Sequence, residues 1–187
     1  ETALAYELGA GPAADIFLIA FAVPEFVFVI LPIVLWPAFI PVFTELRLHA
    51  GDTAAWRFGL RVAGALLALL LGVTALVALS VPIYLRWLAP GFGPLQRAQA
   101  VQAVYIMLPA LSLMGEAALA SAVLQVYRRF ARPALATAVR NLTFVVVLLG
   151  APLAWLAGKA AWGVTLGAAA ALLLQLTLLW KVRPRTE

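Results

Sequence analysis

Two glutamates stand inside long apolar runs of the chain, where an ionisable side chain could bind an ion or a substrate. Glu25 follows Pro24 in the run 13–44, and Glu116 lies in the run 98–127. In a bilayer such a group costs about 2.5–3.5 kcal/mol on insertion scales, so each carboxyl should face protein or water. Beside carbonyls that a proline leaves free, a carboxylate could hold a proton or Na⁺. Both residues are therefore candidate binding groups.

Each candidate also has a structural explanation. Glu25 could be protonated or hydrogen-bonded and tie a broken helix to its neighbour, and we weigh this equally with a functional role. Ser112, Glu116 and Ala120 recur on one helical face, a small and polar pattern that more often packs helices together. Asp15 is a third acidic candidate, but its place at a helix start favours capping of free amides and interaction with the helix dipole.

Most other chemistry is excluded by residue type. The chain has no Cys and only His49, so it lacks thiolate zinc sites, cysteine nucleophiles and multi-histidine metal sites. No phosphate-binding loop or nucleophile elbow occurs, so we expect neither an enzyme nor a cofactor. Gly163 and Gly167 fit the G-x-x-x-G spacing, which we interpret as helix packing.

The composition places these residues in a membrane. Of 187 residues, 65% are apolar and 11% charged, with a mean hydropathy of +1.04, whereas soluble domains are about 45–50% apolar and about 25% charged. The net charge is +5, but the basic residues are scattered between apolar runs. They are typical of membrane-flanking charges, so we expect membrane lipids and not nucleic acid as partners.

Five apolar runs are long enough to cross a bilayer as helices. The sequence thus predicts an all-α, polytopic transmembrane helical bundle of about five full spans, preceded at 1–9 by the end of a first helix. The spans are 13–44, 62–85, 98–127, 134–156 and 160–180. The first contains four prolines that should kink or break it and could gate a cavity, namely Pro24, Pro32, Pro37 and Pro41.

Basic residues predict the orientation of the bundle. Short cytoplasmic loops collect Lys and Arg, so the segments 46–61 and 128–140 and the C-terminus should be cytoplasmic. Arg128, Arg129 and Arg132 could simply follow this rule, which we favour, or could also hold an anionic lipid head group.

Several segments also match one family in their order. The chain reads LGAGPAAD at 8–15, FIPVF at 39–43, LAPGF at 88–92 and LQVYRRFARPALATAVRNL at 124–142, with Pro109 between the last two. In this order they resemble the MurJ/MviN-like lipid II flippases of the MOP exporter superfamily. The resemblance implies a multi-pass protein of the bacterial inner membrane, with about fourteen helices in two lobes. We expect residues 1–187 to form the amino-terminal lobe, a fragment of such a two-lobe transporter.

The departures from the family pattern concern its central cavity. The resemblance implies basic residues where this chain has Ala22, Phe28 and Val29, and a neutral amide where it has Glu25. Loss of these cations is unfavourable for a diphosphate-linked substrate, which is normally held by Arg. The substrate implied by the family therefore fits less well than the fold.

Three functions follow from these observations. The leading hypothesis is a transporter of a lipid-linked oligosaccharide that works by alternating access of two lobes, with Glu25 and Glu116 coupled to an ion. The alternative is a degenerate flippase fold that acts as a membrane scaffold or partner subunit, its cavity filled by Phe26, Phe28 and Trp36. The third is a cation or drug exporter of the same superfamily, which an acidic cavity would suit.

Overall fold

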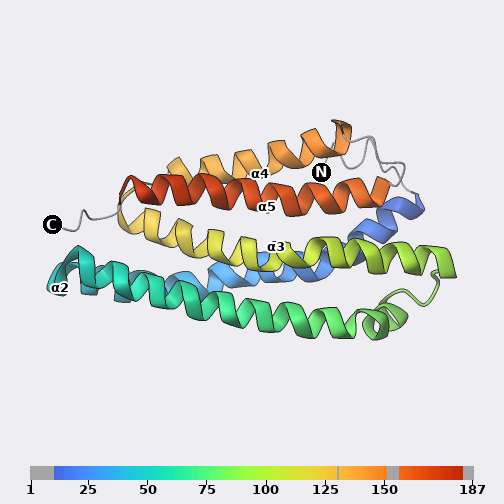
Figure 1. The fold of residues 1–187 in the computed structure, drawn as a ribbon, viewed down its shortest axis with the longest axis horizontal. Coiled ribbons are helices and arrows are strands. Elements are labelled where there is room, and N and C mark those ends of the chain that lie inside the picture. The colour runs from blue at the N-terminus through green and yellow to red at the C-terminus, as the bar shows by residue number, and fades with distance from the viewer. Residues whose placement is uncertain (1–10, 130, 151–155, 183–187) are drawn as a thin grey trace.

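The computed structural model describes residues 11–129, 131–150 and 156–182, which form a bundle of long helices with no strand among them (Figure 1). The helices are α2 (Pro12–Leu88), α3 (Pro94–Val126), α4 (Ala131–Gly150) and α5 (Leu156–Trp180). All four are long and apolar enough to span a membrane. Because α2 doubles back on itself, they make five crossings, as the sequence predicted. The expected helix end at 1–9 lies outside the described residues.

Gly51 divides α2 into two antiparallel arms, 12–50 and 52–88. Its φ of 83° and ψ of 169° are open to glycine and strained for other residues. The prediction that 46–61 forms a connecting segment is therefore wrong, because both arms stay helical up to this single residue. Polar residues near Gly51 extend the helices beyond the apolar runs and do not end them.

The four prolines do not interrupt the first arm of α2. Backbone dihedrals remain helical past Pro24, Pro32, Pro37 and Pro41, so the prediction that these prolines could break the helix is wrong. Proline's fixed φ of about −65° is compatible with a helix even though its missing N–H removes one bond. Figure 1 shows the blue beginning of α2 at an angle to the rest of the arm. The gating role of the prolines stays a prediction.

Side-chain hydrogen bonds connect α3, the central helix, to its neighbours. Such bonds matter in a membrane because hydrocarbon offers polar groups no other partner. The helix also buries a row of apolar side chains, including Met107, Leu111 and Leu124. The bonds are Thr165 Oγ1 to the Ile106 carbonyl (2.7 Å), Gln175 Nε2 to Ser121 Oγ (2.8 Å) and Trp36 Nε1 to the Ala118 carbonyl (3.0 Å).

The segments predicted to be cytoplasmic share one end of the bundle. The Gly51 turn, the α3–α4 junction and the end of α5 all lie at the left in Figure 1. The basic segments thus lie at one end of the bundle, as the loop charges predicted. That this end faces the cytoplasm stays a prediction. One boundary is wrong: Arg140, assigned to the segment 128–140, lies well inside α4, which begins at Ala131.

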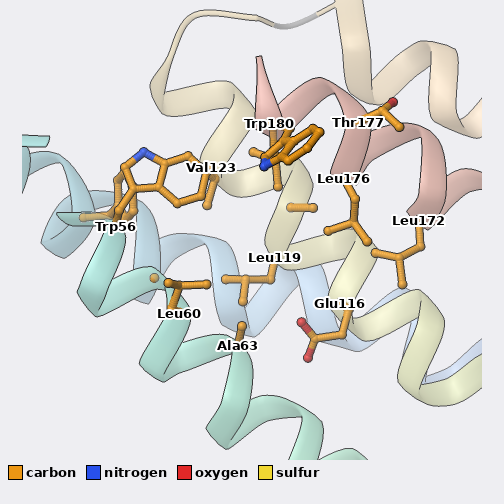
Figure 2. Close-up of a pocket in the computed structure, with 14 residues that line it drawn as sticks. Trp56, Leu60, Ala63, Glu116, Leu119, Val123, Leu172, Leu176, Thr177 and Trp180 are labelled. Atoms are coloured by element: carbon orange, nitrogen blue, oxygen red, sulfur yellow. The ribbon is translucent and has the colours of Figure 1, made fainter. Parts of the chain in front are cut away.

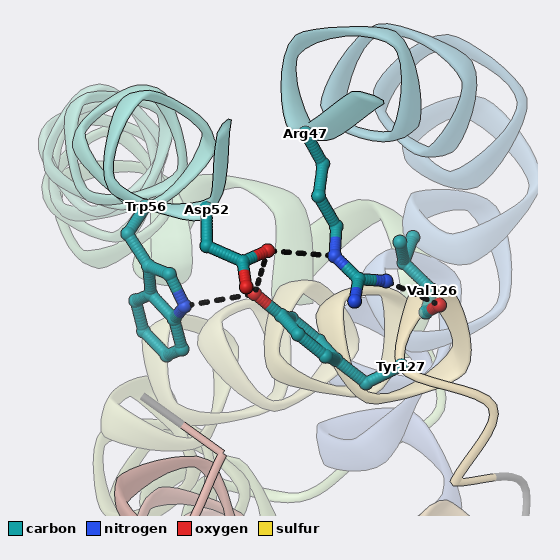
Figure 3. A network of polar contacts seen from close by, with 5 residues as sticks. All are labelled: Arg47, Asp52, Trp56, Val126 and Tyr127. Atoms are coloured by element: carbon teal, nitrogen blue, oxygen red, sulfur yellow. Dashed lines mark hydrogen bonds and ion pairs between the residues drawn. The ribbon is translucent and has the colours of Figure 1, made fainter. Parts of the chain in front are cut away.

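A polar cluster closes this end of the bundle (Figure 3). Arg47 Nε donates to Asp52 Oδ1 at 2.7 Å, and the Tyr127 hydroxyl donates to the same oxygen at 3.2 Å. Trp56 Nε1 donates to the Tyr127 hydroxyl at 3.0 Å, while the Arg47 guanidinium lies 4.2 Å from the Tyr127 ring centroid. Burial, with the charge of Asp52, raises the pKa of Tyr127, so its hydroxyl stays a neutral donor. The cluster ties both arms of α2 to the end of α3.

The two glycines of the G-x-x-x-G spacing bring α5 against α4, which confirms their interpretation as packing residues. A Cβ on Gly163 would lie 2.9 Å from the Phe144 ring. A Cβ on Gly167 would lie only 2.8 Å from the backbone carbonyl oxygen of Arg140. Since a backbone atom cannot swing aside as a side chain does, α4 and α5 can approach this closely only with glycine at 167.

We predict that Gly167→Ala lowers the free energy of unfolding by about 1–3 kcal/mol, because the added methyl group forces α4 away from α5. Thermal unfolding in detergent measures the effect. Gly72→Ala is the matched control, since a Cβ there meets nothing within 4 Å. Equal stability of the two variants would contradict the close packing.

We also predict that Tyr127→Phe destabilises the protein by about 1–2 kcal/mol, because Trp56 loses its acceptor and Asp52 loses a donor. The same unfolding measurement applies. Tyr105→Phe removes an exposed hydroxyl with one bond, to the Ala78 carbonyl, and should cost less. A larger loss at Tyr105 than at Tyr127 would show that the cluster does not stabilise this end.

Candidate functional site

Arg140 and Glu25 line the same cavity, which we call the Arg140 cavity. Its volume is about 510 Å³, and α2, α3, α4 and α5 all contribute to its wall. The lining includes Glu25 and Phe28 from α2, Met114 from α3, Asn141 and Phe144 from α4 and Gly163 from α5. One cation and one carboxyl thus face a mostly apolar space.

The Arg140 guanidinium contacts Phe28 and Asn141. It lies 4.2 Å from the centroid of the Phe28 ring, a cation–π contact, and Nη2 is 3.5 Å from Asn141 Oδ1. No ion pair joins it to Glu25 in the part of the chain that the structure describes. Because it is not neutralised by that carboxylate, the guanidinium keeps donors available for a ligand.

A second, smaller hollow of about 240 Å³ lies next to the Arg140 cavity. The two share Phe28, Met114 and Arg140, and the smaller one also reaches Trp36 and Gln175. Arg140 therefore lines two neighbouring spaces. An elongated ligand could place an anionic group at Arg140 and extend to either side.

Arg140 is not among the binding residues predicted from the sequence, because the basic segment 128–140 is predicted to be a loop. The signal was present in Pro133, which is tolerated in the first turn of a helix and so marks the beginning of α4. Counting from Ala131 at 1.5 Å per residue places Arg140 roughly 14 Å along the helix, near the middle of a bilayer of about 30 Å.

Glu116 lies in a different cavity, which we call the Glu116 cavity. It also measures about 510 Å³ and lies between the second arm of α2, α3 and α5 (Figure 2). Met114, two residues earlier on α3, lines the Arg140 cavity, and residues two apart point to different sides of a helix. The structure therefore does not bring Glu25 and Glu116 together.

Asp15 lies outside both cavities. The N-cap of α2 is Gly11, which has no side-chain cap bond, so the capping role predicted for Asp15 is wrong. Asp15 is exposed in the first turn, where its charge still favours the helix dipole. The described residues hold no group of three or more potential metal ligands.

One arginine at the α3–α4 junction, Arg128, has an unusual backbone conformation. Arg128 has a φ of 55° and occupies the left-handed position that follows a helix, with Arg128 N–H bonded to the Gln125 carbonyl and Arg129 N–H to the Leu124 carbonyl. This is a Schellman ending, in which glycine is the usual residue. Both arginine side chains are exposed and free to meet a lipid surface. Only the helical backbone of Arg132 is described.

Comparison with known proteins gives consistent matches. The family model described as "Lipid II flippase MurJ" matches residues 4–186. A probable lipid II flippase MurJ of Rhizobium meliloti (strain 1021) is 34% identical over 96% of this chain and 35% of its own length. One from Rhizobium tropici is 33% identical over 79% of this chain and 28% of its own. The chain thus spans about a third of the curated relatives it matches.

A solved structure shows the same fold. A lipid II flippase MurJ in an inward closed conformation superposes with a TM-score of 0.73 over 96% of this chain and 38% of that chain, at 16% sequence identity. The match covers nearly all of the bundle, including α3, α4 and α5.

We predict that the Arg140 cavity is hydrated in the membrane. In a cysteine-free form of the full-length protein, Glu25→Cys should react with a water-soluble thiol reagent, because only a thiol in contact with water forms the reactive thiolate. Leu69→Cys is the control, since Leu69 is 62% exposed but lies within the most apolar part of α2. Protection of both cysteines would contradict a hydrated cavity.

Proposed function

Because this chain belongs to the lipid II flippase MurJ family, we propose that it forms one lobe of a transporter that moves a lipid-linked oligosaccharide across the bacterial inner membrane. The second lobe, on the same or another chain, completes the transport path, and the two lobes alternate access to it. Lipid II is the substrate named for the relatives. No covalent chemistry is part of this proposal.

Arg140 is the observation that carries the proposal. A lipid-linked sugar joined through a diphosphate presents anionic oxygens, and a guanidinium in a low-dielectric cavity is the side chain best suited to bind them. The resemblance places basic residues where this chain has Ala22, Phe28 and Val29. Arg140 lies over the ring of Phe28, so a cation carried by α4 stands beside a position where α2 has lost one.

Glu25 gives the same cavity a coupling group. As a free carboxylate it would repel a diphosphate, so the substrate binds more strongly when Glu25 is protonated or holds a cation. Binding of the ion and of the substrate then favour each other, which is the requirement for coupled transport. The exposed Glu25 side chain can exchange its ion with water.

The exposed arginines at the α3–α4 junction complete the arrangement. We place this end of the bundle, with the C-terminus, on the cytoplasmic side, where anionic lipid head groups attract basic residues. Arg128 and Arg129 would contact these head groups, and Arg132 follows one turn later.

The scaffold alternative requires a filled cavity. Phe28 lines both hollows and Trp36 lines the smaller one, but space remains in both, and Phe26 is 65% exposed. These observations favour transport. The cation exporter alternative is disfavoured by Arg140, because a guanidinium on the cavity wall repels a cationic substrate.

We predict that Arg140→Gln abolishes function. The full-length protein should rescue cells depleted of their own lipid II flippase, and the variant should fail at equal membrane expression, with survival reduced at least about a hundredfold. Arg140→Lys should rescue partly, because it retains the charge without the bidentate fork. Arg86→Gln, an equal charge change at an exposed helix end, should rescue fully.

Full rescue by Arg140→Gln would contradict the assignment of the cavity. Failure of the wild-type protein, together with a stable co-purifying partner and no effect of Glu25→Gln on its function, would instead support the scaffold. Counting survivors after depletion separates these outcomes when expression is measured in parallel.

A further inference from the structure

The Glu116 cavity has the composition of a binding site for a hydrophobic cation. Apart from Glu116, its wall is apolar or aromatic except for Thr177. Thr177 Oγ1 donates to the Leu174 carbonyl, and Trp56 Nε1 donates to Tyr127, so these donors are already used within the protein. Glu116 is the only ionisable residue of the lining.

One oxygen of the Glu116 carboxyl lacks a partner among the described residues. Its Oε1 atom is buried and makes no hydrogen bond, and Figure 2 shows the carboxyl extending from α3 toward the side of α2 that carries Ala63. A buried carboxylate without a donor or cation nearby is strongly unfavourable. Something outside the described residues must therefore satisfy it when it is ionised.

The shape and access of the cavity suit a ligand from the membrane. Its volume of about 510 Å³ lies within the range of sites for small organic molecules. Leu60 of α2 and Leu176 of α5 both line it and are 64% and 50% exposed, so its wall reaches the outer surface of the bundle, where lipid would lie. Trp56 and Trp180 lie at the end away from Glu116, where aromatic faces also attract cations.

From these contacts we propose that the Glu116 cavity binds a lipophilic monocation, an apolar or aromatic body with one positive charge that pairs with Glu116. An acyl chain would fill the apolar wall but leave the carboxylate unpaired, and an anionic head group would be repelled by it. The site is separate from the Arg140 cavity, with α3 between them, and does not depend on the proposed transport of a lipid-linked sugar.

The test uses the full-length protein in nanodiscs of phosphatidylcholine, with tetraphenylphosphonium as the probe. Equilibrium dialysis, corrected with empty nanodiscs, should show saturable binding. Glu116→Gln should weaken it by about tenfold or more, because a charge-assisted contact is lost. Glu45→Gln makes the same chemical change at an exposed carboxyl that lines neither cavity, and should retain wild-type affinity.

A second variant separates the cavity from the charge. Ala63→Phe keeps Glu116 but fills the space in front of it, and should also abolish binding. Tetraphenylborate, an anion of the same shape, tests the charge: its affinity should not fall in Glu116→Gln.

Absence of saturable binding to the wild-type protein would overturn the proposal and leave a proton as the partner of Glu116. Loss of affinity in Glu45→Gln, or none in Glu116→Gln, would overturn it as well. None of these readouts requires flipping, so a failure of the proposed transport leaves the test intact.

Discussion

Hydrocarbon cannot satisfy a polar group, and this constraint organises the whole bundle. Backbone bonds must close within helices, so the described residues form long helices joined by short turns, and the four prolines inside the first arm of α2 remain helical. Polar side chains must reach a neighbouring helix, as Thr165 and Gln175 reach α3. The few groups that find no such partner are then the ones open to ligands, and Glu116 is the clearest of them.

The position of the cavity cation depends on backbone packing as much as on its own side chain. Gly167 lets α5 approach the carbonyl oxygen of Arg140, and Phe28 supports the guanidinium from α2. Arg140 is thus held through its backbone from one side and through its side chain from the other. Fixed donors suit phosphate recognition, because little conformational freedom remains to be lost when the ligand binds.

The central helix α3 also separates two cavities that carry different charged groups. On one side Arg140 and Glu25 share a cavity in which both signs of charge are present, whereas on the other Glu116 stands alone among apolar side chains. Two carboxyls that look equivalent in the sequence therefore have different chemistry. In the two proposals, Glu25 couples an ion to an anionic substrate and Glu116 pairs with a cationic ligand.

The sequence by itself determined that this is a helical membrane protein, because a high apolar content and apolar runs of about 20 residues are what a bilayer requires. It predicted the all-helical fold, the five spans, the shared end of the basic segments and the packing role of Gly163 and Gly167. These features depend on local pattern, such as the length of an apolar run or the spacing of small residues, and need no knowledge of distant contacts.

Only the tertiary structure decided the rest. It placed the turn of α2 at the single residue Gly51 and moved Arg140 from a loop into a cavity, because the beginning of a helix is weakly marked in sequence. It also put Glu25 and Glu116 on opposite sides of α3, since the partners of each carboxyl come from helices far away in the chain.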